Sequence, residues 1–411
     1  MCDMFPPAFG PRMGYLCKYL KLHGWNPVVI TEYIEEDTFA FLAKQLNENK
    51  LEITYIRYYR RKGWKGKVEW GWTFLRDVLF NYKDKRIYRE AMKIADKYSF
   101  DLILCSTYRT FPMQAAARFA QKKRLPLIID LRDIIEQYTG HEFITHPLPK
   151  IFGFDKLIAS LFRKRNLAIR NRILHEAVYV TTISPWHVSV LSAYNKNTKL
   201  IYNGYDPDIF YPVNKKNNIF FITYTGRIHS AALRDPDLLF QAIQRLEKNN
   251  IIDVNNFRMQ WYVDKKSRQI IEKEVEKYSD ISLFMNYLEY IPASKIPEAL
   301  HESEILLLLT NKSDDNGPKG VMTTKLFESL AVGKPILCVR GDEGCIEEVI
   351  NQTRSGLSAH IADEVYNFIK NHYLRWQAGL LYKDNSNKEE IKKYSRELQA
   401  EQFIEIFVFY A

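Results

Sequence analysis

The sequence lacks the features that mark a secreted or a membrane-spanning protein. Its five cysteines are scattered and include no Cys-x-x-Cys pair, a pattern that indicates reduced thiols rather than a disulfide framework. No apolar run reaches the roughly 18 to 20 residues that cross a bilayer, and the first residues do not resemble a signal peptide. We therefore expect a cytoplasmic protein, associated at most peripherally with the inner face of the plasma membrane.

The composition is that of a basic, globular protein. A chain of 411 residues exceeds one ordinary domain, and its hydrophobic content of 46% excludes a disordered chain. The formal net charge of +10 favours anionic partners: nucleotides, phosphorylated lipids, acidic membrane surfaces or nucleic acid.

Short apolar runs alternate with amphipathic stretches along the chain. The runs are brief, continuous and bounded by polar or turn residues, as buried parallel strands are, and the stretches between them supply helical crossovers. This pattern predicts an α/β fold of doubly wound parallel sheets covered on both faces. The expected strands are residues 27–31, 102–105, 125–130, 178–183, 220–225, 304–309 and 335–339.

Turn residues divide the chain near 203–218, and a second series of strands and helices begins at Phe220. We expect a first domain over 1–210, a second over 211–387, and a C-terminal helix within 388–411 that packs back on the first domain. Residues 1–7 offer at most four strand-like positions. The first strand is therefore either stunted or begins upstream of Met1.

The most informative stretch runs from Gly320 to Leu337 and reads as a loop, a helix start and a Gly-Lys-Pro turn into a strand. Lys325 and Glu328 share one face of the helix. A helix N-terminus with exposed amides seats a phosphate, and a carboxylate one turn later can accept hydrogen bonds from ribose hydroxyls. The stretch therefore predicts a nucleotide-linked ligand.

Five segments together resemble the GT-B glycosyltransferases, in particular the retaining family 4 enzymes of bacterial surface-polysaccharide (capsule or O-antigen) biosynthesis. The resemblance implies two Rossmann-like domains whose sheets face one another across a cleft. It implies a hexosyltransferase that moves a sugar from a nucleotide-sugar to a saccharide acceptor, polyprenyl-diphosphate-linked, with retention of configuration and no cofactor. The segments are Phe5-Pro-Pro-Ala-Phe-Gly10-Pro-Arg12-Met-Gly14, Asp130-Leu-Arg132-Asp133, Thr182-Ile-Ser184 with Asn203-Gly204-Tyr-Asp206, Tyr224-Thr-Gly226-Arg227 with Arg234-Asp235-Pro236, and Lys325-Leu-Phe-Glu328 with Gly333-Lys-Pro335.

The chain departs from the family at one position. Many members carry two glutamates eight positions apart; the second is Glu328 here, but Gly320 stands at the first. The resemblance assigns the first glutamate to the donor sugar. That role passes to Asp314, to Asp315 or to backbone amides of residues 320–322.

The donor-site candidates lie in both halves of the chain. In the second half, Arg227, after the strand that ends at Thr225, and Lys325 would hold the diphosphate, and Glu328 the ribose. The alternatives are an interdomain salt bridge for Arg227 and a surface ion pair for Lys325 and Glu328. The donor-binding candidates are Gly10, Arg12, Gly226, Arg227, Thr324, Lys325 and Glu328, with Gly10, Arg12 and Gly14 placed in the loop after the first strand; Arg234 is either a further cation or a structural turn residue.

The acceptor-side candidates are Tyr108, Arg132 and Asp133, at the ends of two expected strands. Asp133 would orient the acceptor hydroxyl or act as a base, and we count it as catalytic with Arg227 and Lys325. The alternative is an Asp–Arg pair that shapes the loop. No metal is required: no Asp-x-Asp motif follows a strand in the manner of metal-dependent transferases, and His141, His146, His175 and His187 lack metal-ligand spacing.

Two basic regions bear on further partners. Residues 57–67 interleave cations with aromatic rings ahead of Trp70 and Trp72, and Lys156, Arg163 and Arg170 recur every seven residues in a helical stretch. Such patterns suit an anionic membrane surface or a solvated basic face. Nucleic acid is not expected, because no recognised binding motif accompanies the charge.

Two rival functions remain, a sugar-nucleotide epimerase of the same architecture and a non-catalytic scaffold.

Overall fold

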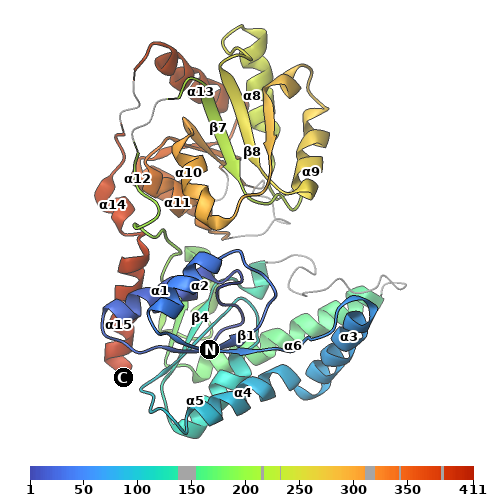
Figure 1. The fold of residues 1–411 in the computed structure, drawn as a ribbon, viewed down its shortest axis with the longest axis vertical. Helices are drawn as coiled ribbons and strands as arrows, with labels where there is room; N and C mark the ends of the chain where they lie inside the picture. Colours follow the sequence, from blue (N-terminus) through green and yellow to red (C-terminus); the bar gives the residue numbers. More distant parts are fainter. Residues whose placement is uncertain (138–153, 214–216, 232, 311–319, 342–343, 381–383) are drawn as a thin grey trace. The chain divides into compact units, whose positions relative to one another are not determined.

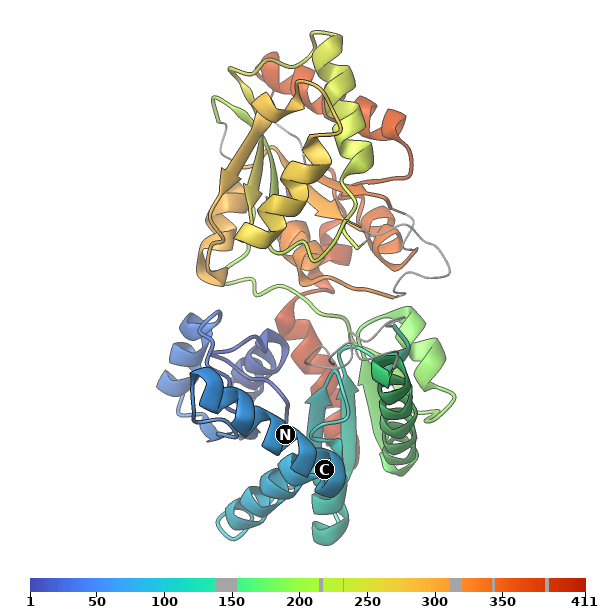
Figure 2. The same ribbon diagram turned by 90° about the vertical axis from the view of Figure 1, so that its right-hand side faces the viewer.

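The computed structural model describes residues 1–137, 154–213, 217–231, 233–310, 320–341, 344–380 and 384–411. The chain forms two compact units. The first unit comprises Met1–Tyr202 and Gln399–Ala411, and the second comprises Asn203–Leu398. Each unit is a parallel sheet with helices on both faces (Figures 1 and 2), so the predicted α/β class is confirmed.

The second unit has the strand order β12-β11-β10-β7-β8-β9, all parallel. The chain runs outward from β7 in one direction and returns to β10 on the other side. Strand order therefore reverses between β7 and β10, and ligands of doubly wound sheets bind at the carboxyl ends of the strands at such a point. The strands are β7 (Phe220–Thr225), β8 (Phe257–Tyr262), β9 (Met285–Leu288), β10 (Ile305–Leu309), β11 (Ile336–Val339) and β12 (Gly356–Ala359). The helices are α8 (Asp237–Lys248), α9 (Lys265–Val275), α10 (Ile296–His301), α11 (Thr324–Val332), α12 (Gly344–Thr353), α13 (Ala362–Gln377) and α14 (Lys388–Lys392).

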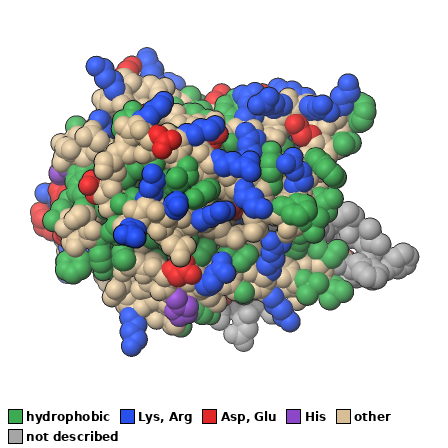
Figure 3. Space-filling model, turned by 90° about the horizontal axis from the view of Figure 1, so that it is seen from below, with side chains coloured by type: hydrophobic (Ala, Val, Ile, Leu, Met, Phe, Trp, Pro, Cys, Tyr) green, Lys and Arg blue, Asp and Glu red, His purple; other side chains and the backbone are tan. Residues whose placement is uncertain are grey.

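The first unit repeats this plan in two sheet segments, β1-β2 and β3-β4-β5-β6. Cys2 links them through parallel bridges to Thr31 of β1 and Ser106 of β3. Cys2 therefore stands where the central strand of a doubly wound sheet lies. The strands are β1 (Val28–Glu32), β2 (Glu52–Ile56), β3 (Ile103–Thr107), β4 (Leu127–Leu131), β5 (Tyr179–Thr182) and β6 (Thr198–Leu200). The helices are α1 (Pro11–Leu22), α2 (Ala40–Glu48), α3 (Gly63–Phe80), α4 (Tyr82–Ile94), α5 (Met113–Lys123), α6 (Phe154–Glu176), α7 (Pro185–Leu191) and α15 (Arg396–Tyr410). Seen from the end of this unit, many basic side chains reach the surface (Figure 3).

The C-terminal segment forms two helices, α14 and α15, where the sequence predicts one. Between them, Ser395 pairs with Tyr205 in a parallel bridge, and the Ser395 hydroxyl accepts a hydrogen bond from the amide of Leu398. These contacts end α14 and cap the start of α15. The last residues pack within the first unit, where Phe407 meets Trp25 with ring centroids 5.5 Å apart.

A buried ion pair ties α1 to the sheet of the first unit. Arg12 donates to both carboxylate oxygens of Asp130, at 3.0 and 2.9 Å, and to the carbonyls of Ile201 and Tyr202. Burial alone would raise the pKa of Asp130, but the Arg12 guanidinium and the hydroxyls of Ser106 and Thr181 outweigh it and lower that pKa. Because the site is buried, either charge without the other would strongly destabilise the fold.

Replacing Arg12 by alanine would leave the Asp130 carboxylate buried without its cation. We expect Arg12→Ala to lower the free energy of unfolding of the first unit by about 3 to 5 kcal/mol, measured by urea unfolding. The control is Lys44→Ala, because Lys44 faces Glu48 at 4.0 Å on an exposed surface, where such a pair contributes about 0 to 1 kcal/mol. Equal effects of the two substitutions would contradict this assignment.

Candidate functional site

The predicted donor residues of the second unit meet at the reversal of strand order. Gly226 and Arg227 follow β7 directly, and the carbonyl of Thr310, just after β10, accepts a hydrogen bond from the amide of Asp235. The ends of β7 and β10 are thus tied together. Lys325 comes from the first turn of α11, which packs against β10.

Lys325 lies against the turn after β7. Its ammonium donates to the hydroxyl of Tyr224 at 2.9 Å and lies 4.1 Å from the centroid of that ring. The Tyr224 hydroxyl in turn donates to the carbonyl of Arg227 at 3.2 Å. Gly226 has φ +106°, and a Cβ there would stand 2.7 Å from both Cε and Nζ of Lys325. Glycine is therefore favoured at this turn by its backbone conformation, and any larger residue would displace the end of the Lys325 side chain.

Further cations surround Lys325. Desolvation lowers the pKa of His229, and the charges of Arg234, Arg227 and Lys325 lower it further. All three cations therefore lie close enough to His229 to act on it. Arg227 keeps a side chain that is 54% exposed and faces Asp264 at 3.4 Å, so the guanidinium remains accessible to a ligand.

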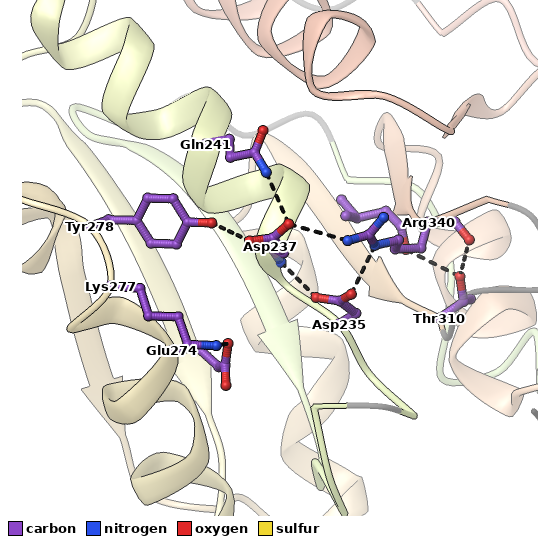
Figure 4. Close-up of polar contacts among 9 residues, drawn as sticks. Asp235, Asp237, Gln241, Glu274, Lys277, Tyr278, Thr310 and Arg340 are labelled. Carbon is purple, nitrogen blue, oxygen red and sulfur yellow. Dashed lines mark hydrogen bonds and ion pairs between the residues drawn. The ribbon is translucent and has the colours of Figure 1, made fainter.

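A second ion-pair network holds the loop that carries Arg234. The Arg340 guanidinium, after β11, contacts Asp235 at 2.9 Å and Asp237 at 3.2 Å (Figure 4). The hydroxyl of Thr310 donates to the backbone carbonyl of Arg340 at 2.6 Å. In Figure 4, Tyr278 reaches Asp237 from the opposite side. This network anchors Asp235 and Asp237 on the ends of β10 and β11, and Arg234 directly precedes them in the chain.

The N-terminus of α11 adds partial positive charge. Thr323 is its N-cap, but no side chain of the cap accepts a hydrogen bond from the helix, and the first turn has no acidic residue. The first amides of a helix lack partners within the helix. The start of α11 at Thr324 and Lys325 is therefore suited to an anion.

Glu328 lies one turn into α11 and is half-buried. Burial raises its pKa to about 7, against the opposing charges of Arg396 and Lys325. The structure thus brings Gly226, Arg227, Thr324, Lys325 and Glu328 together around two neighbouring elements. Gly320 has φ +68°; Asp314 and Asp315, the alternatives for the donor sugar, lie outside the described residues.

The predicted acceptor-side residues form a second cluster, in the first unit. Asp3, directly after the residual first strand, pairs with Arg132 and accepts from the hydroxyl of Thr107 at 3.2 Å. Tyr108 lies beneath Arg132, with 5.6 Å from the guanidinium to the ring centroid. Burial raises the pKa of Asp133 to about 6, against the charge of Arg132 and a hydrogen bond with Gln137. Carboxyl ends of neighbouring strands place these side chains at one edge of the sheet.

The placement of Arg12 differs from the loop position that the sequence predicts. Helix α1 begins at Pro11, so Arg12 and Gly14 are helical and Gly10 is the N-cap. Arg12 is 4% exposed and bound to Asp130 and two carbonyls, because a charged group inside the unit needs those partners. A Cβ on Gly10 would lie 2.7 Å from the carbonyl oxygen of Met4. Both residues therefore have structural roles in the first unit. The geometry does not favour the prediction that either of them binds the donor.

Sequence reasoning missed Tyr224, His229 and Asp3. Tyr224 is buried in β7 and reads as core. His229 stands two residues beyond Arg227, which is the one signal that points to it. Asp3 lies in the stunted first strand that residues 1–7 predict, and nothing in the sequence indicates that this strand ends just before it. In the described part of the chain, no group of three His, Cys, Asp or Glu side chains has the geometry of a metal site, and no helix there is both long and apolar enough to cross a bilayer. His141 and His146 lie outside that part.

The comparisons with known proteins identify the fold. No protein-family model matches the chain, and no curated protein is similar to it in sequence. The crystal structure of Alr3699/HepE from Anabaena, solved with UDP and glucose, matches with a TM-score of 0.62 and 13% identity over 99% of this chain and 98% of that one. A glycosyltransferase from Rickettsia africae matches with a TM-score of 0.61 and 15% identity over 99% and 96%. A putative UDP-N-acetylglucosamine 2-epimerase from Listeria monocytogenes matches with a TM-score of 0.52 and 10% identity over 98% and 94%. The fold is the GT-B fold of two Rossmann-like units, as predicted.

The close approach of Lys325 to Gly226 gives a direct test of the cluster. In Gly226→Ala the new methyl group would lie 2.7 Å from Lys325 Cε and Nζ, so we expect the ammonium to move and the affinity for a nucleoside diphosphate to fall about tenfold or more. Isothermal titration calorimetry measures this. Gly71→Ala is the control, because nothing lies within 4 Å of its Cβ position. Unchanged nucleoside diphosphate affinity in Gly226→Ala would contradict the assignment.

Proposed function

We propose that this protein is a glycosyltransferase that moves a sugar from a nucleotide-sugar to a saccharide acceptor. One observation carries the proposal: Arg227, Arg234 and Lys325 gather at the reversal of strand order, beside the uncapped N-terminus of α11. Cations and unpaired amides at one place are what a diphosphate requires. The UDP bound in the similar Anabaena structure makes a uridine nucleotide the first donor to test.

The proposed roles follow from the chemistry of each group. Arg227 and Lys325 hold the diphosphate, and their charges stabilise it as the bond to the sugar breaks. Glu328 accepts hydrogen bonds from the ribose hydroxyls, most strongly as the ionised carboxylate. Its pKa is about 7, and hydrogen bonds from the ribose favour the ionised form. In this proposal Gly226 leaves room for the end of the Lys325 side chain, and the backbone amide of Thr324 donates a hydrogen bond to the phosphate.

The acceptor belongs to the first unit in this proposal. Asp133, beside Arg132 and Tyr108, orients the acceptor hydroxyl. The family resemblance supports a polyprenyl-diphosphate-linked saccharide of surface-polysaccharide biosynthesis and retention of anomeric configuration. No step of this scheme assigns a role to a metal or cofactor.

Substitutions in the donor cluster test the proposal. We expect Lys325→Ala and Glu328→Ala each to lower the transfer rate at least about tenfold, or about 1.4 kcal/mol in the barrier, because each loses a contact to the donor. The measurement is sugar transfer from UDP-sugars to a lipid-linked saccharide. Lys266→Ala, on the exposed side of α9, is the matched control.

The transfer assay and a nucleotide-binding panel separate the rival functions. Conversion of the donor alone into a stereoisomer would establish an epimerase in place of a transferase. A panel of nucleoside diphosphates that leaves the melting temperature unchanged would establish a scaffold. Near-normal transfer in both Lys325→Ala and Glu328→Ala would show that this cluster is not the donor site.

The raised pKa of Asp133 predicts a pH dependence. The ionised carboxylate accepts a hydrogen bond from the acceptor hydroxyl more strongly than the protonated group does, so at saturating donor the rate should fall as pH drops through about 6. Asp133→Asn should be slower and lack this acid limb. Glu328→Gln should keep the limb, because at saturating donor the ionisation of Glu328 no longer limits binding. An acid limb that persists in Asp133→Asn would contradict the role.

A further inference from the structure

Helix α3 carries two apolar faces, of which one is covered. On the covered face, Trp70 and Phe74 stack with centroids 5.3 Å apart, and Phe74 stacks on Phe162 of α6 at 5.7 Å. The Arg165 side chain of α6 donates to the carbonyl of Val78 at the end of the same helix. These contacts fix α3 against α6, so the opposite face of α3 has a defined orientation.

The opposite face is an apolar stripe exposed to solvent. Its members follow a spacing of four, four, three and four residues, which aligns them along one side of a helix. The exposed fractions are Trp64 71%, Val68 62%, Trp72 61%, Leu75 44% and Leu79 60%. The start of α6 adds Leu157 at 56% and Leu161 at 59%. We call the five α3 residues the apolar stripe.

The segment that carries the apolar stripe is basic. Residues 57–80 contain seven Lys and Arg but two acidic residues. Both acids are engaged locally, since Glu69 accepts from the amides of Arg60 and Arg61, and Asp77 from the amide of Lys83. Figure 3 shows green and blue side chains next to one another toward the side where α3 and α6 lie in Figure 1, with few red ones among them.

The α6 contribution is smaller than its seven-residue repeat of cations predicts. Lys156 is exposed, but Arg170 is 1% exposed and pairs with Glu136 at 2.5 Å. Ile173 lies in the core of the first unit. Arg170 and Ile173 in the later turns of α6 are therefore structural, and the exposed large apolar side chains of these two helices lie on α3 and the first turns of α6.

We propose that the apolar stripe of α3, with Leu157 and Leu161 of α6, docks on an anionic lipid bilayer. Tryptophan rings and aliphatic side chains enter the boundary between headgroups and acyl chains, while lysines beside them reach the anionic headgroups. A second copy of the chain is disfavoured as the occupant, because it would bring two strongly basic segments together. The proposal does not rest on the sugar-transfer reaction, and it accounts for access to a lipid-borne acceptor.

The test is co-sedimentation of the full-length protein with lipid vesicles. Vesicles of phosphatidylcholine with phosphatidylglycerol should bind the protein, with weaker binding to phosphatidylcholine alone and at high salt. The double variant Trp64→Ser/Trp72→Ser should bind about tenfold more weakly to the anionic vesicles. Lys65→Glu/Lys67→Glu should lose binding to a similar extent.

Matched controls separate docking from general effects of charge or apolarity. Lys97→Glu/Lys122→Glu removes two exposed lysines elsewhere on the same unit, and Leu22→Ser/Phe409→Ser removes two exposed apolar side chains. Both controls should bind the vesicles as the parent protein does. All variants should keep the melting temperature and the UDP affinity of the parent, which distinguishes loss of docking from loss of fold or of donor binding.

Three results would overturn the proposal. The first is absence of binding to anionic vesicles. The second is binding that the controls lower as much as the Trp64/Trp72 variant does. The third is a sedimentation-velocity result in which the parent protein is a dimer and Trp64→Ser/Trp72→Ser is a monomer, because the apolar stripe would then be an interface between copies.

Discussion

The account depends on one close contact, the Lys325 ammonium lying against the backbone at Gly226. Glycine suits this position, because its φ is +106° and a Cβ there would lie 2.7 Å from Nζ and push the ammonium away. The Tyr224 hydroxyl accepts a hydrogen bond from the ammonium and donates one to the carbonyl of Arg227. One buried tyrosine thus couples the lysine of α11 to the backbone of the turn that carries the arginine, and the Lys325 ammonium has a defined place before any ligand arrives. Such preorganisation is what makes charge stabilisation effective.

The two units gather different groups at the same edge of a doubly wound sheet. In the second unit, strand order reverses between β7 and β10, and the groups gathered there are cationic. In the first unit it reverses at Cys2, between β1 and β3, and the groups gathered there include Asp3 and Asp133. In the same unit, Arg12 and Asp130 form a buried ion pair in which each charge compensates the other. This difference supports the proposal that the second unit binds the anionic diphosphate and the first unit orients the acceptor hydroxyl.

Strands with unbroken apolar runs were predictable from the sequence, and all seven expected strands occur within two residues of their predicted bounds. Strands with interrupted runs were missed. In β8, Gln260 breaks the run, yet it is buried and satisfied by the Thr223 hydroxyl at 3.0 Å. The edge strands β2, β6, β9 and β12 are short or partly exposed, and carry little pattern.

The candidate site was predictable where residues follow strand ends or helix starts, as Arg227 and Lys325 do. Arg12 shows the limit: the sequence places it near a glycine-rich turn, but its partners, Asp130 and the carbonyls of residues 201 and 202, come from more than a hundred residues away. The contact of Lys325 with Tyr224 spans a similar separation. No local pattern encodes either pairing.

The central claim is that Lys325 recognises the diphosphate of an activated sugar. Calorimetric titration of the parent protein and of Lys325→Ala with UDP and with UMP tests it most directly. The account predicts that the parent binds UDP about tenfold or more tightly than UMP and that the substitution removes most of this preference while UMP binding is retained. An unchanged preference in Lys325→Ala, or no binding of UDP by the parent, would contradict it.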